Sequence, residues 1–368
     1  MTKTAETKYF KHVRHRFLLL LIFALVTMLI SLQAIMIGPA SIPLDEMFGI
    51  IKQSILKFIG LEQASEGIID PVSIAVVESI RLPRILAAVL VGASLAVSGA
   101  CMQSMLRNPL ADPGLLGISS GAMFGACFYI TLAGALTEWM PKLFNTIGTL
   151  GLPVFAITGA LGTTLIVFIL SQHRGNTVMA VLLLAGIAIN ACIGSATGYL
   201  IFLADDNELR SITFWTLGSL GYATWKELSF AIPLILLPVI VLLFTAKDLN
   251  GMLLGEKEAK CLGIHVQWVK NLCIILIAIS VGTSVSICGM IGFVGLVVPH
   301  LVRICVGADN RFVLLGSVIM GPFLLVASDT VARTVVSPAE MPIGIITSLI
   351  GAPFFLFLLI KSKRQIVF

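Results

Sequence analysis

The chain has 368 residues, of which 58% are hydrophobic and 12% are charged, and its formal net charge is +5. Soluble globular proteins carry about 25% charged residues, so a fold of this length cannot hide so much apolar surface from water. We therefore exclude an ordinary soluble protein and expect a chain that lies largely in lipid.

The first segment is basic up to Arg16 and apolar from Phe17 to Ile37. This order is typical of a secretory signal peptide, but the apolar run lacks the usual small-residue cleavage site. We expect a retained first membrane helix, preceded by a tail over residues 1–16.

Long stretches without Asp, Glu, Lys or Arg predict the membrane helices, each of which needs about 20 residues. The uncharged runs are 17–44, 85–106, 113–137, 143–172, 175–204, 228–246, 271–302, 312–328 and 341–360. The run 271–302 is too long for one helix, and its glycine-rich CGMIGFVG favours a break, with the second helix continuing past Arg303. The predicted fold class is an all-α polytopic membrane protein with ten transmembrane helices in a single domain, 17–360.

The distribution of charge predicts the orientation. Both chain ends are basic, and an even number of spans puts both in the cytoplasm, with a second tail over 361–368. This topology places 16 of the 24 Lys and Arg residues inside, but 6 of the 19 Asp and Glu residues. The excess of Lys and Arg in cytoplasmic loops of membrane proteins thus explains the positive net charge, and no nucleic-acid partner is needed to account for it. The same topology places the charged loop 247–270 in the cytoplasm.

Residue types that carry chemistry are scarce in the predicted spans. None has Asp, Glu, Lys or Arg at its centre, where ion-coupled carriers usually keep a relay; His300 is the nearest candidate, expected at a cytoplasmic helix end. The sequence has no GxxxxGK[ST] motif, and its seven cysteines form no close CxxC pair. We expect no metal site and no enzyme activity in this chain.

Small residues recur at helical spacing in two predicted spans. Gly117, Gly121 and Gly125 share one helix face, and Gly194 and Gly198 share another. Such faces let membrane helices approach closely, so we expect them to pack against neighbouring helices.

Three segments, 79–122, 204–225 and 289–359, interrupt the apolar pattern, and the charged cytoplasmic loop is a further interruption. Arg81 and Arg84 stand at the outer end of the second span, whose inner end leads into the turn RNPLADPG. An outer loop contains a short amphipathic piece, 211–220, too short to span the membrane, and the cytoplasmic loop contains a second short helix, 254–264.

The motifs RLPR, NPLADPGLLG, IGFVGLVVPHLVR and PIGIITSLIGAP, in this order, resemble the permease subunits of bacterial ABC importers for iron-siderophores, haem and vitamin B12, the type II importers. The resemblance covers residues 80–360. It implies a homodimer in the inner membrane with the pathway on its two-fold axis, two cytoplasmic ATPase subunits that hold ATP and Mg, and a periplasmic binding protein. It implies no cofactor in this chain and no nucleic-acid partner.

The resemblance also implies roles for matching residues. Arg81, Arg84 and Arg333 would bind glutamates of the binding protein. The alternative is that these arginines only extend their charged ends to the membrane interface. The inner gate would comprise Asn108, Leu110, Gly175, Asn176 and Thr177. The vitamin B12 permease of this family would have small hydroxyl residues at the second gate segment. This chain has Asn176 and Thr177 there, so it departs from that pattern. The contact with the ATPase would comprise Leu254, Gly255, Glu256, Ala259, Leu262, Gly263 and Ile264, unless this segment is a solvated loop.

The segment LRSITFWTLGSLG looks more like the haem permeases than like the siderophore permeases. Arg210 would meet a propionate, and Phe214 and Trp215 would flank a planar ring; alternatively, Arg210 holds the loop and the aromatics form an interfacial belt. We expect an ATP-driven importer of haem, with a ferric siderophore or cobalamin as the alternative substrate. An ion-coupled secondary carrier and a membrane receptor without transport are the alternatives from other classes.

Overall fold

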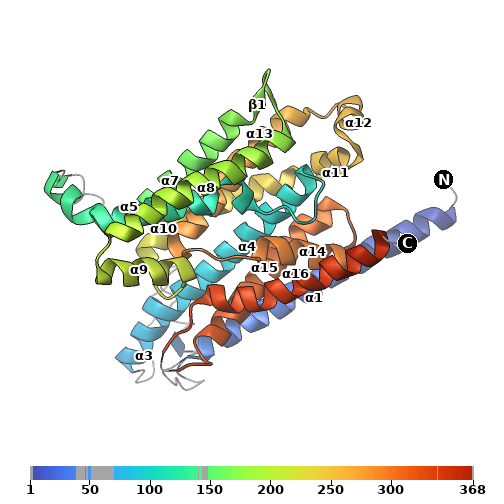
Figure 1. Ribbon diagram of the computed structural model, residues 1–368. Coiled ribbons are helices and arrows are strands. Elements are labelled where there is room, and N and C mark those ends of the chain that lie inside the picture. Colours follow the sequence, from blue (N-terminus) through green and yellow to red (C-terminus); the bar gives the residue numbers. More distant parts are fainter. Residues whose placement is uncertain are drawn as a thin grey trace.

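The computed structural model describes residues 3–38, 46, 49–50, 70–139, 141–142, 148–337 and 339–366. Long helices lie side by side in one slanted bundle (Figure 1). The chain begins and ends at the same end of this bundle, close to the helix α12, whereas α3 and α9 lie at the opposite end. An even number of crossings requires this arrangement; which membrane face each end occupies stays a prediction.

Ten long helices build the bundle in the described part of the chain. They are α1 (Lys3–Met36), α4 (Leu82–Met105), α5 (Ile118–Trp139), α7 (Gly151–Leu170), α8 (Met179–Leu203), α10 (Trp225–Phe244), α13 (Val266–Cys288), α14 (Val294–Val306), α15 (Asn310–Ala332) and α16 (Ile343–Ile366). Short elements join them: α3 (Pro71–Val76), a π-helical turn η1 (Val77–Arg81), the 3-10 turns η2 (Pro113–Leu116) and η3 (Gly148–Leu150), α9 (Asp206–Leu217), α11 (Ala246–Leu254) and α12 (Glu256–Cys261).

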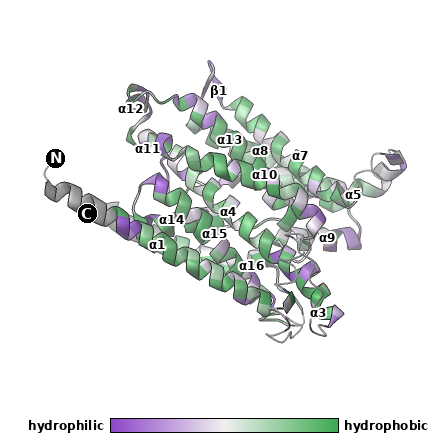
Figure 2. Ribbon diagram, turned by 180° about the vertical axis from the view of Figure 1, so that it is seen from behind, coloured by the Kyte–Doolittle hydropathy of each residue, from purple (hydrophilic) through white to green (hydrophobic). Residues whose placement is uncertain are grey.

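Seven helical segments among the described residues are long and apolar enough to cross a membrane. Three shorter apolar stretches, Ile118–Gly134, Val294–Val306 and Ile343–Phe357, occupy the remaining predicted spans. Figure 2 shows that hydrophobic residues dominate the long helices and that hydrophilic ones gather mainly toward the ends of the bundle. An all-α membrane fold is thus observed, while the count of ten membrane crossings stays a prediction.

The predicted break in the run 271–302 is confirmed. Helix α13 ends at Cys288, Gly289 and Phe293 adopt positive φ of 69° and 67°, and α14 begins at Val294. The second helix continues past Arg303 to Val306, as expected.

Helix α4 lies at the centre of the core and packs against α15, α14, α13 and α10. Its close crossings depend on glycine, because a Cβ on Gly92 would overlap the backbone of Gly321, and a Cβ on Gly99 would overlap that of Gly295. Glycine therefore sets how closely the helices in the middle of the bundle approach one another.

The two predicted glycine faces behave differently. Gly121 and Gly125 pack against the backbone of α7, as expected, but Gly117 lies before α5 with φ of 79° and is not part of this helix face. A Cβ on Gly194 or Gly198 of α8 would meet no atom within 4 Å in the described part of the chain. This α8 face is therefore uncovered in the single chain.

Three local predictions need correction. The amphipathic helix expected at 211–220 begins at Asp206, because the side chain of Asp205 accepts the N–H of Glu208 at 2.8 Å in a capping box, and it ends at Leu217, before Gly218. The segment 254–264 is not one helix: Leu254 ends α11, Gly255 turns the chain with φ of 135°, and α12 follows. The all-α prediction also missed a small hairpin, β1 (Gln172–His173) paired with β2 (Asn176–Thr177).

Candidate functional site

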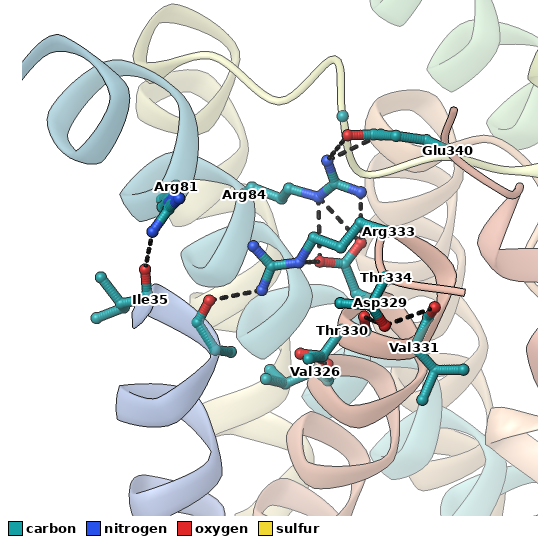
Figure 3. Close-up of polar contacts among 12 residues, drawn as sticks. Ile35, Arg81, Arg84, Val326, Asp329, Thr330, Val331, Arg333, Thr334 and Glu340 are labelled. Carbon is teal, nitrogen blue, oxygen red and sulfur yellow. Dashed lines mark hydrogen bonds and ion pairs between the residues drawn. The ribbon is translucent and has the colours of Figure 1, made fainter. Parts of the chain in front are cut away.

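A cluster of arginines and carboxylates occupies the end of the bundle near α3 (Figure 3). Arg84 of α4 donates through Nε to both carboxylate oxygens of Asp329 at 3.0 Å and through Nη2 to one of them at 2.9 Å. Its Nη1 donates to Glu340, in the loop between α15 and α16, at 2.8 Å and 2.9 Å. The guanidinium fork thus ties α4 to α15 and to the following loop.

The other two arginines of the cluster hold the end of α1. Arg81 donates to the carbonyl oxygen of Ile35 at 2.7 Å, and Arg333 donates to that of Ala34 at 2.6 Å. Arg333 Nε also lies 3.5 Å from Asp329, four residues earlier on α15. These bonds satisfy carbonyl groups at the C-terminal end of α1, which have no partner within the helix.

The three predicted docking arginines therefore lie together, and all three are buried. Their described partners belong to this chain, and Glu340 is the exposed member of the cluster, with 42% of its side chain accessible. The sequence analysis missed Asp329 and Glu340; the spacing of Asp329 and Arg333 on one helix was an available signal. Docking of another protein here stays a prediction.

The predicted substrate residues come together in a cavity. Arg210, Phe214 and Trp215 of α9 line a space of about 590 Å³ bounded also by α5, α7, the start of α10 and the end of α13. The guanidinium carbon of Arg210 lies 5.9 Å from the centre of the Phe214 ring. Tyr222 and Glu227, which the sequence analysis did not name, also line this cavity. It combines a cation, a carboxylate and aromatic surfaces in one space.

A second cavity, of about 750 Å³, lies against the end of α9, the break after α13 and the first half of α16. Asp112, in the turn after α4, and Ser119 also line this cavity. Burial raises the pKa of Asp112, and the N–H of Gly114, which donates to it at 2.7 Å, opposes that rise. Helix α9 contributes residues to both cavities, so its position affects the shape of each.

The predicted inner-gate residues lie on two separate loops. Asn108 accepts the N–H of Leu110 at 2.9 Å within the turn that follows α4. Gly175 has φ of 77° in the hairpin turn, Asn176 is exposed, and Thr177 is buried. Among the described residues no hydrogen bond joins the two loops. Their role as an inner gate stays a prediction.

The predicted ATPase-contact residues divide by exposure. Leu254 and Leu262 are 67% and 63% exposed at the end of the bundle that holds both termini, whereas Ala259 is buried. Ile264 packs against Gly251 of α11. A groove of about 860 Å³ runs alongside, lined by Lys260 and by residues 263–268. The surface thus presents two exposed leucines on a short helical elbow whose inner side is packed.

His300 lies midway along α14, not at a helix end as expected, and its ring centre is 6.0 Å from that of Phe354 on α16. It therefore takes part in helix packing.

The FecCD transport family matches residues 20–361, nearly the whole chain. This chain belongs to the FecCD transport family. Among the similar proteins is the hemin transport system permease protein HmuU of Yersinia pestis, which is 47% identical to the present chain over 287 residues. The match covers 78% of the present chain and 84% of HmuU. The cobalamin import system permease protein BtuC of Halobacterium salinarum is 41% identical over 284 residues, covering 77% and 73%.

A solved structure described as an inward-facing conformation of a metal-chelate type ABC transporter superposes on the FecCD chain with a TM-score of 0.71 at 34% identity. The match covers 86% of this chain and 98% of that one. The FecCD chain is an integral membrane permease of a type II ABC importer, which confirms the resemblance drawn from the motifs and decides against an ion-coupled carrier.

Proposed function

We propose that this permease imports haem across the bacterial inner membrane. The observation that carries the proposal is the cavity beside α9, where Arg210 offers a cation to a propionate and Phe214 and Trp215 offer faces to a planar ring. The hemin permease of Yersinia pestis at 47% identity supports the same substrate. Cobalamin remains the second candidate, because cobalamin permeases reach 41% identity, and a ferric siderophore is the third.

We propose that the transporter contains two copies of this chain. The uncovered face of α8 with Gly194 and Gly198 supports this assignment, since small residues let a helix of a second copy approach closely in lipid. In such a pair, Asn108, Leu110, Gly175, Asn176 and Thr177 of both copies would surround the inner end of the pathway and close it without a buried charge.

The energy would come from two cytoplasmic ATPase subunits that hold ATP and Mg, since this chain has no nucleotide-binding motif. The exposed Leu254 and Leu262 on the α11–α12 elbow are suited to a groove on such a subunit. A periplasmic binding protein would dock at the opposite end, over the arginine cluster, where its glutamates would have to compete with Asp329 and Glu340 for the buried arginines.

The test is uptake into vesicles that contain the permease with its ATPase and binding protein. We expect ATP-dependent uptake of haem, competition by unlabelled haem, and little competition by cobalamin or a ferric siderophore. Arg210→Gln should lower haem uptake, whereas Arg311→Gln, an exposed arginine at the other end of the bundle, should not. Uptake without ATP, or stronger transport of cobalamin than of haem, would contradict the proposal.

A further inference from the structure

A lysine lies fully inside the cytoplasmic end of the bundle. Lys270 is on the second turn of α13, and 2% of its side chain is exposed. Its Nζ donates to Glu256 Oε1 at 2.6 Å and to the carbonyl oxygen of Thr177 at 3.4 Å. Glu256 is the first residue of α12, and Thr177 is the last residue of β2. One ammonium group thus contacts α12 and the hairpin at once.

The two contacts of Lys270 differ in strength. A charge-assisted bond at 2.6 Å is short, whereas the bond to the carbonyl at 3.4 Å is long, so Glu256 is the dominant partner. A buried ammonium without a partner costs several kcal/mol. Lys270 therefore has to follow Glu256 when α12 moves, or bind the carbonyl oxygen of Thr177 more closely.

The hairpin is attached to the same part of α13 through amide side chains. The hydroxyl of Thr177 accepts from Gln267 at 2.6 Å and donates to Asn271 at 2.9 Å, and both of these residues lie on α13. Within the hairpin the same hydroxyl accepts from Gln172 at 2.8 Å. The two bonds to α13 hold β2 over the first turns of that helix. A change in the contact between Lys270 and Thr177 consequently acts on a hairpin that is already positioned there.

The surroundings leave room for movement. A cavity of about 280 Å³ lies between α12 and the hairpin, and its wall includes Asn176, Thr177, Glu256, Lys260 and Lys270. Gly255, with φ of 135°, joins α11 to α12. The side chain of Glu256 is 43% exposed, so the pair extends from the interior to the surface that α12 presents.

We propose that Lys270 is a positioning residue that transmits displacement of α12 to the hairpin 172–177. Movement of α12 shifts Glu256, the ammonium of Lys270 shifts with it, and the backbone of Thr177 and the exposed Asn176 next to it change position. The inference rests on the proposed ATPase contact at α12, and it adds the route by which that contact reaches the proposed gate. A lysine that merely stabilises the fold would hold the hairpin without making it respond to nucleotide.

The experiment reports on the hairpin directly and does not require the substrate to be known. Asn176→Cys is introduced into a chain in which the exposed Cys192, Cys261 and Cys305 are replaced by Ser. The complex with its ATPase is labelled with a water-soluble maleimide, with and without ATP. We expect ATP to change the labelling rate about five-fold or more. Lys270→Met should abolish this change while ATP is still hydrolysed.

Two further variants keep the test decisive if Lys270→Met fails to fold. Glu256→Gln should weaken the response to ATP, and Lys270→Arg, which keeps a cation that can donate to both Glu256 and the carbonyl oxygen of Thr177, should retain it. An undiminished response in Lys270→Met or in Glu256→Gln overturns the inference. No response in the chain that retains both residues, although ATP is hydrolysed, overturns the proposed ATPase contact as well. The two failures are therefore distinguishable.

Discussion

The arginine cluster at the α3 end allows a prediction whose magnitude follows from the contacts. Asp329 bonds to two buried arginines, and its own side chain is 2% exposed. Removing one member of a buried ion pair costs about 3–5 kcal/mol, because it leaves a charge uncompensated. In Asp329→Asn, Arg84 keeps Glu340 and Arg333 keeps the carbonyl oxygen of Ala34. We therefore expect a loss near the lower limit, about 3 kcal/mol.

The contrast with Glu340 makes the prediction specific. Glu340 binds the same arginine, but 42% of its side chain is exposed, and pairs of this kind contribute about 0–1 kcal/mol. Glu340→Gln should thus cost much less than Asp329→Asn. Ser328→Ala is the matched control, because the Ser328 hydroxyl is buried and has no hydrogen-bond partner among the described residues. Its replacement should be close to neutral.

The assay is thermal unfolding of the purified permease in one detergent, at one pH and salt concentration. A loss of 3 kcal/mol corresponds to a fall in Tm of about 6 °C, taking about 2 °C per kcal/mol for a chain of this size. Asp329→Asn combined with Arg84→Met should cost less than the sum of the two single changes. Equal losses of stability in Asp329→Asn and Glu340→Gln would refute the reasoning. Strictly additive losses in the double variant Asp329→Asn with Arg84→Met would refute it as well.

Three further predictions concern other parts of the molecule. Gly99→Ala should lower stability by about 1–3 kcal/mol in the same assay, because its Cβ would overlap the backbone of α14, whereas Gly162→Ala, with open space around the Cβ, should be neutral. Leu254→Asp with Leu262→Asp should leave Tm unchanged but reduce ATP-dependent uptake; normal uptake would show that these exposed leucines make no essential contact. Burial raises the pKa of Asp112, so ionisation of this carboxyl group destabilises the folded wild type as pH rises from about 4 to 7.5. Asp112→Asn cannot ionise and should therefore become more stable relative to wild type over this range. A difference in Tm that does not change with pH would contradict this.

The sequence was sufficient for the membrane class, the positions of the ten apolar segments and the break between α13 and α14. Each depends on local composition: a membrane span needs an uncharged run of a certain length, and a glycine-rich interruption marks where such a run turns. The family also followed from the sequence, because its motifs are contiguous strings of residues. The start of α9 was missed although its capping box is local, since the amphipathic pattern alone was used to place the helix.

Side-chain partnerships depended on the tertiary structure. Arg84 and Glu340 are 256 residues apart, and Lys270 meets the carbonyl group of Thr177 across 93 residues. No local pattern shows that Arg81, Arg84 and Arg333 are buried among carboxylates and carbonyl groups, because an arginine at the end of a span is equally compatible with snorkelling to water.

Composition and periodicity determined which segments enter the membrane, because lipid admits helices whose backbone bonds are satisfied internally and whose side chains are apolar. The tertiary structure decided what the few polar groups do. Lys270, Asp329 and Arg84 are buried where an oppositely charged side chain on another helix meets them, and a buried charge is tolerated when such a partner is in place. The same packing decided that the glycines of α5 contact a neighbouring helix, while those of α8 remain uncovered within this chain.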